Sequence, residues 1–286
     1  MSRRSPLLDR RAVFSSAAAV ALLAATGVGA AGVPARGGRL RMALSGGARS
    51  DSWVQGDGLF MQVARQGLIY DTLTEVAADG TLRAELALGW KASADARIWD
   101  FDLRPGVPFH DGAAFTAADA VASLRGRVAG EISAPGADRL RITLERPNVG
   151  LPMLLSGPEY VIRPAHALDA GIGTGLYRMR RFWPGQQVLA TRVASHYRDG
   201  TAGWFDEVEL TSIPSESVRG QALSEYMVDA VDITDAGGLS GLPDIHLMPD
   251  TRQPVQAVSA AVAQPTQVSA LRPLDNLRAA ERWWFA

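Results

Sequence analysis

One segment, residues 99–124, constrains the fold of this chain more than any other; it reads WDFDLRPGVPFHDGAAFTAADAVASL. Apolar and acidic side chains alternate over residues 98–103, which predicts a half-buried strand. The Arg-Pro-Gly sequence at 104–106 breaks that strand, because proline cannot donate to the ladder and glycine tolerates turn dihedrals. Thr116, with Asp119 three residues later, matches a capping box and predicts the start of a helix. The segment therefore predicts a strand, two turns and a capped helix in succession.

The rest of the chain carries both the strand and the helix periodicity. Alternation of apolar and polar residues predicts strands at 39–44, 87–93, 139–144, 206–213, 228–233, 243–248 and 256–262. A hairpin is predicted over 177–192, because Pro184 and Gly185 are suited to a type II turn. Helical spacing of apolar residues predicts helices at 59–70 and 215–227. The fold class expected from this pattern is mixed α/β.

Composition excludes several classes of function. The chain has 286 residues, 47% apolar and 21% charged, which suits a soluble globular protein with a real core. It has no cysteine, so it has no disulfide, no thiolate nucleophile or metal ligand, and no lipoprotein anchor. The four histidines lie far apart, and no H-x-x-x-H pair suggests a metal site. The formal net charge is −1, and residues 1–31 carry four arginines and one aspartate, a net of +3, so the chain without them is at −4; this weak acidity argues against nucleic acid as a partner.

The amino terminus has the features of an export signal. Four arginines within residues 2–11 precede an uncharged, alanine-rich run at 12–31. The Arg10–Arg11 pair, with Phe14 just after it, resembles a twin-arginine signal. We expect residues 1–31 to direct export and to be cleaved, which leaves a periplasmic domain. An uncleaved membrane anchor is the alternative, but a run so rich in alanine and glycine inserts poorly.

Four motifs together resemble one protein family. They are GLIYDTLT at 67–74, LALGW at 86–90, FHDGAAFTAAD at 109–119 and GTGLY at 173–177. Their order and spacing resemble the extracytoplasmic solute-binding proteins of peptide and nickel ABC importers, solute-binding family 5. The resemblance implies a type II periplasmic-binding-protein-like fold, with residues 32–267 forming mainly the first lobe and its β-rich subdomain. Residues 273–282 resemble the segment that opens the second lobe, so 268–286 are expected to be a remnant of that lobe's start.

Two small-residue segments are the candidate ligand contacts. The strand at 39–44 runs directly into residues 45–47, and ligands of mixed α/β sheets bind where strands end in such turns. The resemblance implies that this strand leads to the ligand cleft, although a simple turn is the alternative. Residues 173–175 match the family's Gly-Thr-Gly-Pro-Tyr segment, with leucine in place of proline, and their spacing is not that of a dinucleotide loop. The candidate ligand-binding residues are Ser45, Gly46, Gly47, Gly173, Thr174 and Gly175.

The resemblance implies a periplasmic substrate-binding component of a peptide-type ABC importer. Such a protein binds a peptide or similar solute and delivers it to a membrane permease and its ATPase. The alternative is a truncated, non-transporting lobe that acts as a periplasmic interaction domain or is a disabled remnant. No cofactor or metal is expected. Enzymatic activity is not expected, because residues 238–241 are one residue short of a G-x-S-x-G elbow, and His110 and Asp111 lie in a predicted turn with a structural role.

Overall fold

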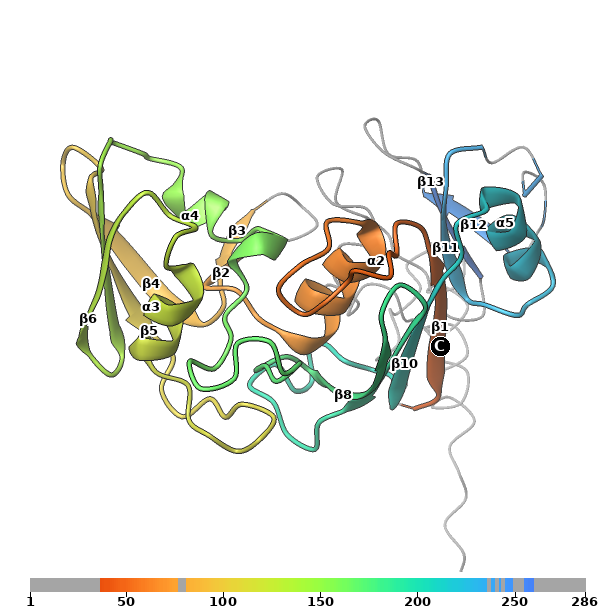
Figure 1. Ribbon diagram of the computed structural model, residues 1–286, viewed down its shortest axis with the longest axis horizontal. Coiled ribbons are helices and arrows are strands. Elements are labelled where there is room, and N and C mark those ends of the chain that lie inside the picture. The colour runs from red at the N-terminus through yellow and green to blue at the C-terminus, as the bar shows by residue number, and fades with distance from the viewer. Residues whose placement is uncertain are drawn as a thin grey trace, which may run out of the picture.

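The computed structural model describes residues 37–76, 81–235, 238, 239, 242, 245–248 and 255–259. Its larger part is a seven-stranded mixed sheet in the order β12-β13-β11-β1-β10-β9-β8 (Figure 1). These strands are β1 (Arg39–Leu44), β8 (Tyr177–Trp183), β9 (Gln187–Arg192), β10 (Glu207–Ser212), β11 (Ala230–Ile233), β12 (Ile245–Met248) and β13 (Val255–Ser259). The predicted mixed α/β class is confirmed.

Strand β1 is the centre of this sheet and the only described strand with two parallel neighbours, β10 and β11. Its alternation places Leu40, Met42 and Leu44 on one face, in a core shared with α2 (Leu59–Gln62) and the π-helix η1 (Val63–Ile69). Ala43 lies on the opposite face, in a second core with α5 (Glu216–Ser224). Helices therefore cover the sheet on both sides, as the buried alternation of β1 requires.

The smaller part is a β-rich subdomain on the far left of Figure 1. A four-stranded antiparallel sheet has the order β4-β5-β7-β6, and β2 (Thr74–Val76) pairs with β3 (Leu82–Ala84) as a separate hairpin. The sheet strands are β4 (Ala87–Ala92), β5 (Ile98–Leu103), β6 (Gly130–Gly136) and β7 (Arg139–Leu144). The short helices α3 (Ala117–Leu124), α4 (Leu151–Leu154) and the 3₁₀ turn η2 (Pro158–Tyr160) complete the subdomain. The expected β-rich subdomain is therefore present.

The motif segment folds as its pattern predicts. Strand β5 buries Trp99 and Phe101 in the subdomain core, while Asp100 and Asp102 on the other face pair with arginines of β7. The carboxylate of Asp119 accepts hydrogen bonds from the backbone N–H of Thr116 at 2.8 Å and from its hydroxyl at 3.0 Å. This capping box fixes the first turn of α3, whose apolar side packs on the sheet.

The helix predicted at 59–70 and the strand β6 show where the structure departs from the sequence prediction. The predicted α-helix at 59–70 is α-helical only over Leu59–Gln62 and continues as a π-helix, closed by a bond from Tyr70 N to Arg65 O at 2.8 Å. The wider turn leaves the carbonyl of Ile69 to accept from Gly175 N at 2.9 Å, a contact from far along the chain. Strand β6 was not predicted, because its sequence contains Pro135 and does not alternate; it pairs with β7 through a bulge.

Some predictions fall on residues outside the described ranges. They include the export signal at 1–31 and the second-lobe remnant at 268–286. Among the described residues, no helix has the length and apolar character needed to cross a membrane.

Candidate functional site

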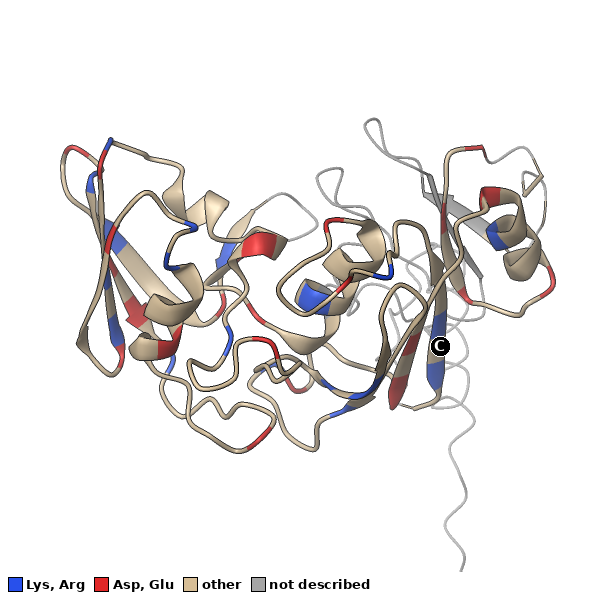
Figure 2. Cartoon of the chain, in the orientation of Figure 1, with Lys and Arg blue, Asp and Glu red and all other residues tan. Residues whose placement is uncertain are grey.

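The two ends of the parallel strands differ in chemistry. At the amino end, Arg39 of β1 forms ion pairs with Glu207 at 2.5 Å and Glu209 at 3.2 Å of β10 (Figure 2). At the carboxyl end, β1 runs into Ser45, whose backbone N–H donates to the Asp232 carboxylate of β11 at 2.8 Å. Asp232 is 1% exposed and pairs with the buried Arg219 of α5, Nε to Oδ1 at 3.3 Å. The carboxyl edge is thus held by one buried ion pair.

Glycines allow the loop at residues 45–47 to pack closely against the start of α2. A Cβ atom at Gly58 would lie 1.8 Å from the carbonyl oxygen of Gly46, and one at Gly47 would lie 2.2 Å from Ser212 Oγ. Gly46 also has a φ of 80°, in the left-handed region that favours glycine. The backbone of residues 45–47 therefore packs against the start of α2, leaving Gly46 exposed and Ser45 and Gly47 half-buried. This is the edge at which solutes of open α/β sheets bind.

The second predicted segment, residues 173–175, lies in the interior. Cβ atoms at Gly173 and Gly175 would lie 2.0 Å from Ile69 O and 2.3 Å from Leu68 O, so both glycines allow close backbone packing on η1. Thr174 donates its hydroxyl proton to the Asp71 carboxylate at 2.9 Å. The segment's polar groups are largely used within the fold. The two predicted segments also lie at opposite ends of the α2–η1 helix, so the structure does not bring them together.

His110 of the motif segment holds residues 173–175 in place. Its ring is buried; Nε2 donates to Gly175 O at 2.9 Å, and Nδ1 accepts from Gly173 N at 3.3 Å. Its backbone N–H donates to Gly173 O at 2.9 Å. A ring that donates at one nitrogen and accepts at the other is neutral. Burial is the main cause that lowers the pKa of His110 below its ordinary value. The structural role expected for His110 is the one seen here.

We expect protonation of His110 to destabilise the fold at mildly acidic pH. Because its folded pKa is lowered, the unfolded chain binds the proton more readily, and the stabilisation present above the unfolded pKa of about 6.5 is lost as pH falls below it. Urea unfolding from about pH 7.5 to about pH 5 should show a shallower pH slope for His110→Gln than for the original protein. Equal slopes in the two proteins would contradict the prediction.

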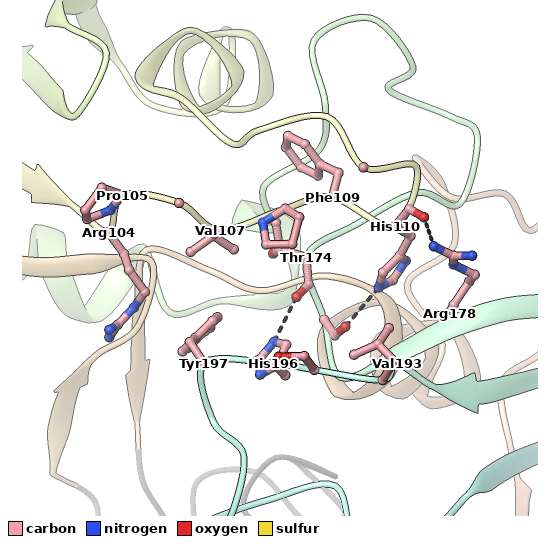
Figure 3. A pocket seen from close by; sticks show the side chains of 16 residues that line it. Arg104, Pro105, Val107, Phe109, His110, Thr174, Arg178, Val193, His196 and Tyr197 are labelled. Carbon is pink, nitrogen blue, oxygen red and sulfur yellow. Dashed lines mark hydrogen bonds between the residues drawn. The ribbon is translucent and has the colours of Figure 1, made fainter.

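A cavity of about 610 Å³ lies between the β-rich subdomain and the large sheet (Figure 3). Three segments far apart in sequence form its wall: residues 104–110 and Gly112 of the loop after β5; Thr174, Gly175 and Arg178 around the start of β8; and residues 193–197 after β9. Thr174 and Gly175 are the only predicted site residues that line it. The other lining residues escaped sequence analysis because no spacing within one segment marks them; only their meeting in space does.

The buried acids beside this cavity are engaged within the protein. Glu75 of β2 pairs with Arg198 at 2.6 Å, and Glu85 accepts from the Thr72 hydroxyl at 2.7 Å. The carboxylate of Asp71 accepts from Thr174 and lies 3.7 Å from His196 Nε2. Within the described residues, no group of three or more potential ligands has an arrangement that could hold a metal ion.

The sequence of this chain matches one family model and several curated proteins. A family model described as "Bacterial extracellular solute-binding proteins, family 5 Middle" matches residues 81–247. The HTH-type transcriptional regulator SgrR of Salmonella typhi is 34% identical over 171 residues, which cover 54% of this chain and 30% of that protein. The probable peptide ABC transporter periplasmic-binding protein y4tO of Sinorhizobium fredii is 31% identical over 131 residues, covering 38% and 24%. The matches thus cover at most 30% of these two curated relatives.

Solved structures match over a larger part of the chain. The periplasmic binding protein AgaA from A. tumefaciens R10, in complex with agropinic acid, has a TM-score of 0.68 at 27% identity, covering 75% of this chain and 48% of AgaA. DppA from Helicobacter pylori, in complex with the peptide STSA, has a TM-score of 0.64 at 21% identity, covering 74% and 50%. The second likeness shows a shared fold. This chain spans about half the length of either protein.

Proposed function

Because this chain belongs to family 5 of the bacterial extracellular solute-binding proteins, we propose that it is the substrate-binding component of a peptide-type ABC importer. In this role it binds a peptide or similar small solute outside the cytoplasm and delivers it to a membrane permease coupled to an ATPase. The function is binding, not catalysis. Residues 1–31 act as the export signal in this proposal.

The observation that carries the proposal is the carboxyl edge of β1, β10 and β11. Parallel strands place their loops at one edge, and this edge combines a glycine-rich loop with exposed backbone at Gly46. Asp232 and Arg219 fix the loop from below, so its backbone is preorganised before a solute arrives. We propose that Ser45, Gly46 and Gly47 contact the solute. The contact predicted for Gly173, Thr174 and Gly175 stays a prediction, and their internal hydrogen bonds favour a supporting role.

The chemical class that we propose for the solute is based on the ligands of the relatives. AgaA was solved with agropinic acid, DppA with a peptide, and y4tO is described as a probable peptide-binding protein. A peptide and an organic acid share at least one carboxylate and several polar groups on a small body. We propose that this chain binds a solute of that kind.

Calorimetric titration with a pool of di- and oligopeptides tests the proposal. The purified protein should show saturable binding, with a dissociation constant in the range of about 1 μM to about 100 μM. Ser45→Glu adds bulk and negative charge at the open edge and should weaken binding at least about tenfold. Ser133→Glu places the same change on β6, away from the edge, and should leave affinity within about twofold. The absence of binding by well-folded protein, or equal weakening by both variants, would contradict the proposal.

A second candidate function is a non-transporting interaction domain. It is favoured by the sequence similarity to SgrR, because SgrR is described as a transcriptional regulator and not as part of a transporter. In this alternative the lobe meets a protein partner in place of a permease. Peptide binding that depends on Ser45 would favour the transport function, whereas a folded protein that binds no peptide would favour this one.

A further inference from the structure

The cavity of Figure 3 is separate from the proposed solute edge, and its lining has a distinctive charge. Its sixteen lining residues include two arginines, Arg104 and Arg178, and two histidines, but no aspartate or glutamate. Its volume of about 610 Å³ lies within the range of small-molecule sites. The acids behind this wall, Asp71, Glu75 and Glu85, are engaged within the protein, so the charged side chains that face the cavity are the two arginines, which favours an anionic ligand.

Arg104 is held in position by a backbone carbonyl and an aromatic ring. Its Nε donates to Glu85 O at 3.1 Å, and its guanidinium carbon lies 4.6 Å from the centre of the Tyr197 ring. Arg178 is anchored from the other side, by donating from Nη2 to His110 O. Within the described part of the chain, neither arginine has an ion pair. Each therefore keeps guanidinium N–H groups that are not used by these anchoring bonds.

The wall between the two arginines is largely apolar and fixed. Figure 3 shows Arg104 and Arg178 at opposite ends, with Val107, Phe109 and Val193 among the side chains between them. The histidine rings on this wall are tied to the backbone: His110 Nε2 is bonded to Gly175 O, and His196 Nε2 to Thr174 O, each at 2.9 Å. These rings support the wall, so the polar groups suited to orient a ligand are mainly at the two ends.

We propose that this cavity is a second binding site, for a small organic dicarboxylate. One carboxylate binds Arg104, the other binds Arg178, and the carbon chain between them packs on the apolar wall. Guanidinium groups pair with carboxylates through parallel N–H···O bonds, which gives both affinity and orientation. All the residues that line the cavity belong to the part of the chain that the structure describes.

Titration of the full chain with dicarboxylates of increasing length tests the inference. Succinate, adipate and suberate are compared with the neutral diamide of adipate. One length should bind best, with a dissociation constant of about 1 mM or tighter, and the diamide should not bind. Arg104→Gln and Arg178→Gln should each weaken the best ligand at least about tenfold. Arg180→Gln removes the same charge from an exposed position of β8 outside the lining, and should change affinity less than about twofold.

Two results would overturn the proposal: no saturable binding of any dicarboxylate, or equal weakening by Arg180→Gln and the two cavity variants. Thermal melting of each variant shows whether it is folded. Arg104→Gln loses the hydrogen bond to Glu85 O and could melt at a lower temperature than the original protein. In that case Arg104→Lys and Arg178→Gln test the proposal. Arg104→Lys is expected to weaken dicarboxylate binding less than Arg178→Gln. Ser45→Glu should leave dicarboxylate binding unchanged. The dicarboxylate proposal and the proposed solute contact at residues 45–47 are therefore tested separately.

Discussion

Replacing Asp232 by alanine is expected to lower the free energy of unfolding by about 3–5 kcal/mol. Asp232 is 1% exposed, and its partner Arg219 is 4% exposed. Its removal leaves a guanidinium buried without its carboxylate, and leaves the Ser45 N–H without its acceptor. Because that N–H positions residues 45–47, peptide affinity should fall together with stability. Urea unfolding and calorimetric titration measure the two effects.

Asp102→Ala is the matched control for this prediction. Asp102 also pairs with an arginine, Arg139 at 3.0 Å, but the Asp102 side chain is 50% exposed and solvent already stabilises both charges. We expect a loss of at most about 1 kcal/mol. A double change of Asp232 and Arg219 to leucine should recover part of the loss, because no buried charge is then left alone. Similar losses from Asp102→Ala and Asp232→Ala would show that the pair at the edge is not the buried support that we describe.

Gly58→Ala is expected to cost about 3 kcal/mol and to disturb the same edge. The φ of Gly58 is −69°, which alanine adopts readily, so the expected loss comes from the close approach alone. The added Cβ would lie 1.8 Å from Gly46 O, and relief requires the backbone of the loop to move away from α2. Chemical denaturation measures the stability loss, and peptide titration should show weaker binding.

The control is Gly220→Ala in the middle of α5. A Cβ atom at Gly220 meets nothing within 4 Å, so alanine should stabilise the helix by about 0.5–1 kcal/mol. The two substitutions add the same methyl group and are expected to change stability in opposite directions. If Gly58→Ala were as harmless as Gly220→Ala, the close packing of residues 45–47 on α2 would be wrong.

The sequence by itself determined the elements whose signals are local. Strand β1 and strand β5 begin and end where alternation predicts, and α3 begins directly after Thr116. Alternation and the capping box each depend on neighbours within a few residues, so a single segment contains the whole signal. The motifs also identified the family, because their order along the chain is itself a property of the sequence.

Only the tertiary structure decided which residues share a site. The π-helical turn before Tyr70, the burial of residues 173–175 and the pairing of β6 all depend on backbone contacts between distant segments. His110 bonds to Gly175, 65 residues away, and His196 bonds to Thr174, 22 residues away, so that Arg104, Arg178 and residues 193–197 line one cavity. Local sequence patterns cannot predict these contacts between distant segments. The free energy that stabilises the contacts comes from packing and hydrogen bonding between segments that meet only after the chain has folded.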